Sequence, residues 1–128
     1  MKAVFKTAYP YLEDALNLPV KNLEAAIPFY ETIMGFRVVS RNDAPYRSAV
    51  LARDDIQIGL AENGGDPTLE GCFFEVDNVA TAFEELKANG LERDEAGFSI
   101  EKDGDASYRV FFVVAPDGLC YMLGERQN

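Results

Sequence analysis

Two stretches of the chain decide its fold, because each is a copy of the other: LPVKNLEAAIPFYETIMGF at residues 18–36 and FEVDNVATAFEELKANGL at residues 74–91. The copies align with one residue deleted, and both predict a strand, a helix and a second strand. Each copy has an asparagine before the helical pattern and a glycine after it, at Asn22 and Gly35 and at Asn78 and Gly90. Asparagine caps the first turn of a helix and glycine ends the last one, so both helices have defined limits.

The remaining pattern indicates an α+β fold of two similar halves. Extended patterns occupy residues 14–20, 36–41, 48–53, 56–62, 72–76, 108–114 and 119–123, with a weaker one near 91–100. Each half therefore predicts a β-α-β-β-β module, at residues 14–62 and 71–125, with a linker of glycine, proline and acids at 63–70. Modules this short bury their apolar faces poorly alone, so we expect both to pack together in a single domain, residues 1–128. Pro28 stands inside the first helical pattern and should kink that helix or delay its start.

The charge of the chain excludes some partners. Lys and Arg total 12 and Asp and Glu total 22, which gives a net charge of −10. This argues against electrostatic binding to nucleic acid or to an anionic membrane. Residues 1–64 carry 7 basic and 8 acidic side chains, whereas residues 65–128 carry 5 and 14, so the second half holds −9 of the total. The acids either form a solubilising surface or create a field that attracts a cationic ligand or partner.

The absence of histidine excludes several enzyme classes. Histidine is the commonest general base and metal ligand, so a Ser-His-Asp triad, a Cys-His pair and an HExxH zinc site are all impossible. Two cysteines, Cys72 and Cys120, make neither a disulfide framework nor a CxxC motif, which favours a reduced, cytoplasmic protein. The first residues lack the apolar region of a signal peptide, and no apolar run approaches the ~20 residues needed to span a bilayer.

Three segments together resemble a known family. They are PVKNLEAAIPFYETIMGFRVVSR (19–41), FEVDNVATAFEELKANG (74–90) and FFVVAPDGLCYMLGE (111–125). They resemble the vicinal oxygen chelate superfamily, which includes glyoxalase I, extradiol dioxygenases, fosfomycin-resistance enzymes and bleomycin-resistance proteins. The last segment is similar to the family's "DPDGN…E" ending. The resemblance implies two modules packed into a curved mixed sheet that encloses a cleft, and a homodimer. It indicates fold more specifically than function, because this fold serves both enzymes and binding proteins.

The resemblance also implies four positions at which enzymes of the family hold a divalent metal. Two lie at the starts of the modules' first strands and two on their last strands; here they are Ala15, Gly59, Gly71 and Met122. None of these side chains binds a hard divalent cation, since methionine is a soft donor. We therefore expect no metal and no cofactor, which speaks against the metal-dependent chemistry of the family's enzymes.

Without a metal, the cleft implied by the resemblance has room for an organic ligand. Residues two apart on a strand share a face, so the neighbours of the four positions should line the cleft too. Together with an aromatic residue near a strand end, the predicted ligand-binding residues are Asn17, Gln57, Gly59, Phe73, Glu75, Tyr108, Cys120 and Met122. Some of these positions could instead be packed core. We predict no catalytic residue, and an unreactive thiol at Cys120, because the sequence places no base beside it.

Three functions remain open. The first is a metal-independent binding protein of the bleomycin-resistance type, a homodimer that sequesters a cationic or aromatic small molecule and so acts in antibiotic resistance. The second is a glyoxalase-like lyase or isomerase, or a dioxygenase, with a non-standard site. The third is a regulatory or interaction subunit whose cleft is vestigial. Metal-dependent turnover would indicate the second function, and capture of a different protein the third.

Overall fold

The computed structural model describes residues 2–11 and 14–128. The elements in chain order are β1 (Phe5–Pro10), β2 (Leu18–Pro19), α1 (Leu23–Thr32), β3 (Arg37–Asn42), β4 (Ser48–Arg53), β5 (Ile56–Ala61), a 3-10 turn η1 (Pro67–Leu69), β6 (Gly71–Val76), α2 (Val79–Ala88), β7 (Ser99–Asp103), β8 (Ala106–Val114) and β9 (Cys120–Arg126). The predicted single domain includes residues 1, 12 and 13, which lie outside the described residues.

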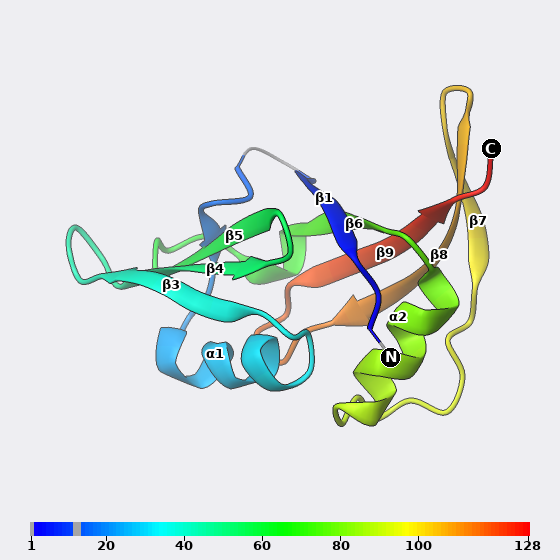
Figure 1. The fold of residues 1–128 in the computed structure, drawn as a ribbon. Coiled ribbons are helices and arrows are strands. Elements are labelled where there is room, and N and C mark those ends of the chain that lie inside the picture. The colour runs from blue at the N-terminus through cyan, green and yellow to red at the C-terminus, as the bar shows by residue number, and fades with distance from the viewer. Residues whose placement is uncertain (1, 12–13) are drawn as a thin grey trace.

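The strands form two mixed sheets, and Figure 1 shows both helices below them, α1 under the first sheet and α2 under the second. The first sheet has the order β2-β5-β4-β3, and the second has β6-β9-β8-β7 with β1 added at its β6 edge. In each half, the four strands of the repeat lie in the spatial order first, fourth, third, second, counted along the chain. The first and fourth strands, β2 and β5 in one half and β6 and β9 in the other, are parallel neighbours. The α+β fold class is confirmed, whereas the module boundaries at 14–62, 63–70 and 71–125 stay a prediction.

Both helices begin in the same way. The side chain of Asn22 accepts a hydrogen bond from the backbone N–H three residues later (3.1 Å), and Asn78 does the same (2.9 Å). A carboxylate on the segment that ends each half accepts the first N–H of the helix: Glu62 for α1 (2.8 Å) and Glu125 for α2 (2.9 Å). Each helix start therefore has two of its free N–H groups satisfied by matched residues of the repeat.

The structure corrects three local predictions. Residues 14–20 are not one strand, because Asp14 accepts a hydrogen bond from the N–H of Asn17 (3.2 Å) and closes a turn, which leaves only β2 extended. The strand β1 was not predicted, and it pairs antiparallel with β6 from the other half of the chain. Pro28 does not delay the helix: α1 begins at Leu23, directly after its asparagine cap, and includes the proline.

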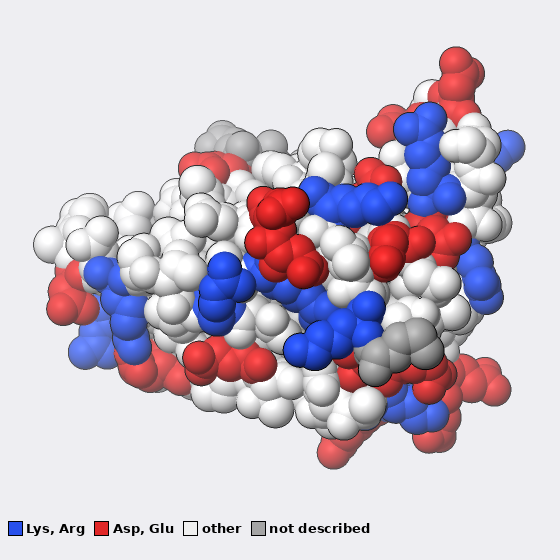
Figure 2. Space-filling view, viewed as in Figure 1, with Lys and Arg blue, Asp and Glu red and all other residues white. Residues whose placement is uncertain are grey.

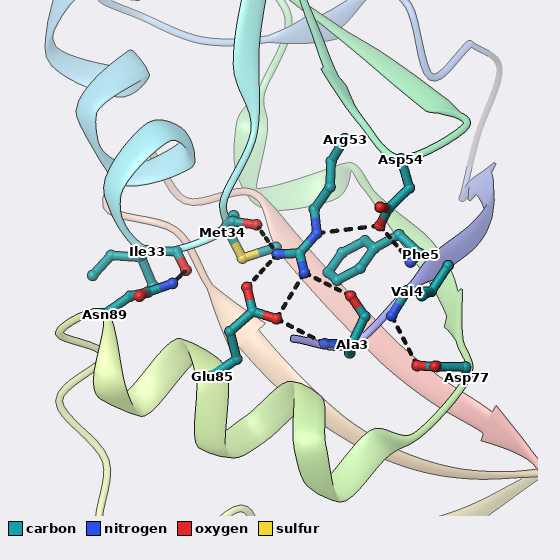
Figure 3. A network of polar contacts seen from close by, with 10 residues as sticks. All are labelled: Ala3, Val4, Phe5, Ile33, Met34, Arg53, Asp54, Asp77, Glu85 and Asn89. Carbon is teal, nitrogen blue, oxygen red and sulfur yellow. Dashed lines mark hydrogen bonds and ion pairs between the residues drawn. The ribbon is translucent and has the colours of Figure 1, made fainter. Parts of the chain in front are cut away.

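The core lies between the helices and the sheets, and two polar clusters cross it. Tyr30 of α1 donates a hydrogen bond to Asp117 (3.1 Å), and its oxygen lies 2.6 Å from the hydroxyl of Tyr121 in β9. Burial holds the pKa of both tyrosines well above the ordinary value and also raises the pKa of Asp117. The second cluster is the ion pair of Arg53 and Glu85, with two N–O distances of 2.7 Å (Figure 3). Both clusters tie the first half of the chain to the second.

Two further observations bear on the environment of the protein. Neither helix in the described part of the chain is long and apolar enough to cross a membrane. Both cysteines are free thiols: Cys72 is buried beneath the second sheet, and Cys120 is half-buried on the opposite face.

Candidate functional site

The second sheet carries a hollow on the face that points away from α2. We call it the aromatic cup; its volume is about 310 Å³, near the lower end of the range for small-molecule sites. Strands β1, β6, β7, β8 and β9 all contribute to it. Its lining residues are Tyr9, Pro10, Tyr11, Phe73, Glu101, Lys102, Asp103, Tyr108 and Met122. Phe73, Tyr108 and Met122 were predicted from the sequence, so the structure brings three of the predicted residues together here.

Aromatic rings make up the floor and one wall of the cup. The rings of Phe73 and Tyr108 meet edge to face, with centroids 5.1 Å apart and planes at 74°. Tyr9 lies opposite Phe73 in the β1–β6 ladder, and these rings are nearly parallel, at 14° and 6.3 Å. Tyr9 is 54% exposed, so most of its face is open to a ligand. Exposed, nearly parallel rings of this kind suit a planar or cationic group.

Tyr11 closes the cup on the side of the N-terminal strand. Its ring lies over Gly71, where an added Cβ atom would come within 2.9 Å of the ring. Its side chain lies near Cys120, and burial raises the pKa of this phenol. Burial also raises the pKa of the Cys120 thiol, which therefore stays protonated and weakly nucleophilic at neutral pH.

Acidic residues stand on the opposite side of the cup. Glu101 of β7 pairs with Tyr108 across the β7–β8 ladder, and Asp103 lies two residues further, on the same face of the strand. With Lys102 between them, the lining has a net charge of −1. Figure 2 shows an acidic tip on this hairpin, at the upper right, with basic side chains directly below it; Asp105 lies in the turn. Residues 99–103 form a strand that pairs antiparallel with β8, so this side of the cup is a hairpin.

The residues at the four implied metal positions do not fit a divalent metal. Ala15, Gly59 and Gly71 have no donor atom in their side chains, and Met122 offers only a thioether. Within residues 2–11 and 14–128, no group of three or more Cys, Asp or Glu side chains is arranged to hold a metal ion.

One of those positions is filled by the protein's own backbone. A Cβ atom on Gly59 would lie 2.1 Å from the carbonyl oxygen of Leu16, and the N–H of Gly59 donates to the carbonyl of Ala15 (2.8 Å). Gly59 on β5 and Met122 on β9 occupy equivalent positions in the two halves. The turn at residues 14–17 therefore covers the first sheet at the position where the second sheet carries Met122. Gly59 is a point of close approach between two backbones, and it adds no room to a cleft.

The remaining predicted ligand-binding residues lie outside the lining of the cup. Asn17 belongs to a separate polar hollow of about 360 Å³, where its side-chain oxygen accepts a hydrogen bond from Asn63 (3.2 Å). Gln57 is exposed on the first sheet, and Glu75 is half-buried on β6, two residues beyond Phe73. Sequence reasoning missed Tyr9 and Tyr11 because β1 precedes the repeat. The signal was present in the spacing of two, which places both rings on one face of an extended strand.

Comparison with known proteins agrees with this architecture. Residues 13–119 match the family model described as the Glyoxalase/Bleomycin resistance protein/Dioxygenase superfamily. A search of curated proteins gave no match. Among solved structures, a protein from the mobile metagenome of V. Pseudocholerae superposes with a TM-score of 0.70 at 20% identity, covering 91% of this chain and 95% of that one.

Two other solved structures that share the fold come from bleomycin-related proteins. One is the bleomycin resistance determinant encoded on the transposon Tn5, with a TM-score of 0.64 and 23% identity over 91% of this chain and 99% of that one. The other is the bleomycin-binding protein of Streptomyces verticillus complexed with copper(II)-bleomycin, with a TM-score of 0.65 and 18% identity over 91% and 98%. The family model covers most of the chain, and this protein therefore belongs to the glyoxalase/bleomycin resistance protein/dioxygenase superfamily.

Proposed function

We propose that the protein binds and sequesters a small organic molecule in the aromatic cup, without a metal and without catalysis. The observation that carries this proposal is the composition of the cup: four aromatic rings on the floor and one wall, and carboxylates on the other. A ligand that fits both sides combines an aromatic ring with a positive charge. Sequestration of such a molecule would protect a cell from a cationic antibiotic, in line with the bleomycin-related proteins of the same fold.

Within the cup, each group has a distinct role in this proposal. Phe73 and Tyr9 supply the surface on which a planar ring stacks, a contact of about 0.5–1.5 kcal/mol beyond the area that it buries. Glu101 and Asp103 attract the cationic end, and the net charge of −10 strengthens that attraction at low ionic strength. Met122 fills the floor with a flexible apolar side chain.

The chain is also proposed to act as a cytoplasmic homodimer. Phe112 and Val114 of β8 lie on the same side of the second sheet as Met122 and are 42% and 65% exposed. A second copy of the chain would bury these side chains, and analytical ultracentrifugation would detect the dimer. The two free thiols support a reducing compartment.

Isothermal titration with bleomycin, a cationic molecule that contains aromatic rings, tests the proposed function. We expect binding that weakens as salt is raised, and a loss of about tenfold or more in the Phe73→Ala variant, which removes a large part of the floor. Tyr46→Ala is the matched control, because Tyr46 is an exposed ring between β3 and β4, outside both the cup lining and the side chains proposed for the dimer surface.

Charge is tested in the same way. Glu101→Gln should weaken binding and flatten its salt dependence, whereas Glu84→Gln, on the exposed face of α2, should change neither. If neither bleomycin nor a panel of smaller cationic aromatic compounds binds, or if Phe73→Ala and Tyr46→Ala weaken binding equally, the proposal is wrong.

A further inference from the structure

The N-terminal segment that carries one wall of the cup is held at its start by an unusual set of contacts (Figure 3). Three successive backbone N–H groups donate to three different carboxylates. Ala3 donates to Glu85 (2.9 Å), Val4 to Asp77 (2.8 Å) and Phe5 to Asp54 (2.8 Å). The carbonyl of Ala3 also accepts a hydrogen bond from Arg53 (2.8 Å). We call these contacts the N-terminal latch.

The latch joins parts of the chain that are far apart in sequence. Asp54 lies in the turn between β4 and β5, Asp77 between β6 and α2, and Glu85 within α2. The segment that they hold is Ala3–Phe5, which then continues along β1 toward the cup. A shift in register between Phe5 and Thr7 separates the latched residues from the regular β1–β6 ladder. At this end the side-chain contacts add to the backbone pairing, which continues as far as the N–H of Asp77 donating to the carbonyl of Val4 (3.0 Å).

We infer that the latch residues Asp54 and Asp77 are positioning residues for the aromatic cup, because they keep β1, and with it Tyr9 and Tyr11, against the second sheet. This inference rests on the proposed function for its effect on ligand binding. Release of the latch should also make the Cys120 thiol more accessible when no ligand is present, because Tyr11 lies near it.

The structure supports this coupling in two ways. First, β1 is the edge strand of the second sheet and pairs with β6 alone, so residues 7–10, beyond the buried ring of Phe5, can separate from β6 without opening the rest of the sheet. Second, Tyr11 follows directly from β1: its N–H donates to the carbonyl of Gly71 (3.1 Å), at the first residue of β6. Separation of β1 from β6 therefore moves Tyr11 away from the Cys120 thiol.

The test measures the rate at which iodoacetamide alkylates Cys120, followed by mass spectrometry in the absence of any ligand. Hydrogen bonds to carboxylates are strong enough that losing one in a half-exposed site should raise the open population about fivefold. Asp77→Ala should therefore speed alkylation of Cys120 about fivefold. The double variant Asp54→Gly with Asp77→Ala should speed it about 25-fold, since both contacts oppose the same opening. Glycine suits position 54, where the backbone has φ of 51°.

Two matched variants separate positioning from general destabilisation. Asp77→Asn keeps a side-chain oxygen that can accept the N–H of Val4, so it should restore most of the protection. Asn78→Ala, one residue further, removes the cap of α2 and lowers stability but leaves the latch intact, so Cys120 should react as slowly as in the wild type. Cys72 is fully buried and reports global unfolding in every sample.

The same variants are then titrated with bleomycin. Because only the closed form binds, the affinity should fall in proportion to the closed fraction, most of all in the double variant, while Asn78→Ala binds normally. If Asp77→Ala leaves the alkylation rate of Cys120 unchanged, or if Asn78→Ala raises it equally, the inference is overturned. Wild-type protein that fails to bind bleomycin or the panel compounds would overturn the proposed function, yet the thiol measurement would still decide whether the latch holds β1.

Discussion

Replacing Glu85 with alanine should lower the free energy of unfolding by about 3–5 kcal/mol, the usual cost of leaving a buried charge without its partner. Arg53 and Glu85 are only 5% and 6% exposed, so water cannot replace the lost carboxylate. In this variant the Arg53 guanidinium would still donate hydrogen bonds to the carbonyls of Met34 and Ala3. A carboxylate oxygen of Asp54 would also remain 3.5 Å from the Nε atom of Arg53. Against a total stability of about 5–15 kcal/mol for a domain, this loss is large.

Urea unfolding followed by circular dichroism measures the loss, which corresponds to a fall in melting temperature on the order of 10–20 °C. A double-mutant cycle with Arg53→Met isolates the pair. The double variant should lose much less than the sum of the two single losses, because neither charge remains. It should still be less stable than the wild type, since the N–H of Ala3 and the carbonyl of Met34 lose their partners, at about 1–3 kcal/mol each. A loss below about 1 kcal/mol for Glu85→Ala, or strictly additive losses, would refute this reasoning.

Three further predictions concern other parts of the molecule. Burial raises the pKa of Asp117, so the folded state binds the carboxyl proton more tightly than the unfolded state does. The free energy of unfolding that Asp117 contributes therefore falls as the pH rises above the ordinary carboxyl pKa of 3.8. Asp117→Asn should therefore gain stability relative to the wild type between about pH 4 and 7 in urea titrations, and a constant difference would contradict the assignment. Gly59→Ala should cost about 1–3 kcal/mol, because the new Cβ meets the backbone of Leu16, and bleomycin titration of the folded variant should show unchanged binding. Burial raises the pKa of Cys72 to about 12 and lifts that of Cys120, so alkylation of Cys120 should accelerate about tenfold per pH unit from pH 7 to 9 while Cys72 stays unmodified, as mass spectrometry would show.

Most of the fold could be predicted from the sequence because its signals are local. The asparagine caps Asn22 and Asn78 lie beside the helices that they start, and each apolar periodicity belongs to a single element. The strand β1 could not be found in this way, because it pairs with β6 about 65 residues later and precedes the repeat. The turn at 14–17 was equally hidden, since it depends on contact with Gly59 from the end of the same half.

The candidate site was predictable only in part. Met122 was identified as a metal position implied by the family resemblance, Phe73 as the residue two beyond Gly71 on the same strand face, and Tyr108 as an aromatic residue near a strand end. Gly59 was misjudged for a physical reason: a missing side chain indicates either free space or another backbone in close approach, and sequence alone does not distinguish the two. The wall formed by Tyr9 and Tyr11 needed the position of β1, which only the tertiary structure supplies.

The matched carboxylates Glu62 and Glu125 have a consequence for how the molecule opens. Each one fastens the start of its helix to the strand region that ends its own half, so each helix and its sheet share a connection that the other half does not touch. Glu62→Ala and Glu125→Ala are therefore the same perturbation made twice in one molecule, under identical solvent and temperature. Amide hydrogen exchange would record the opening of α1 and of α2 separately in each variant. If one substitution speeds exchange in both helices, the two halves open cooperatively; if it speeds exchange only in its own helix, they open independently.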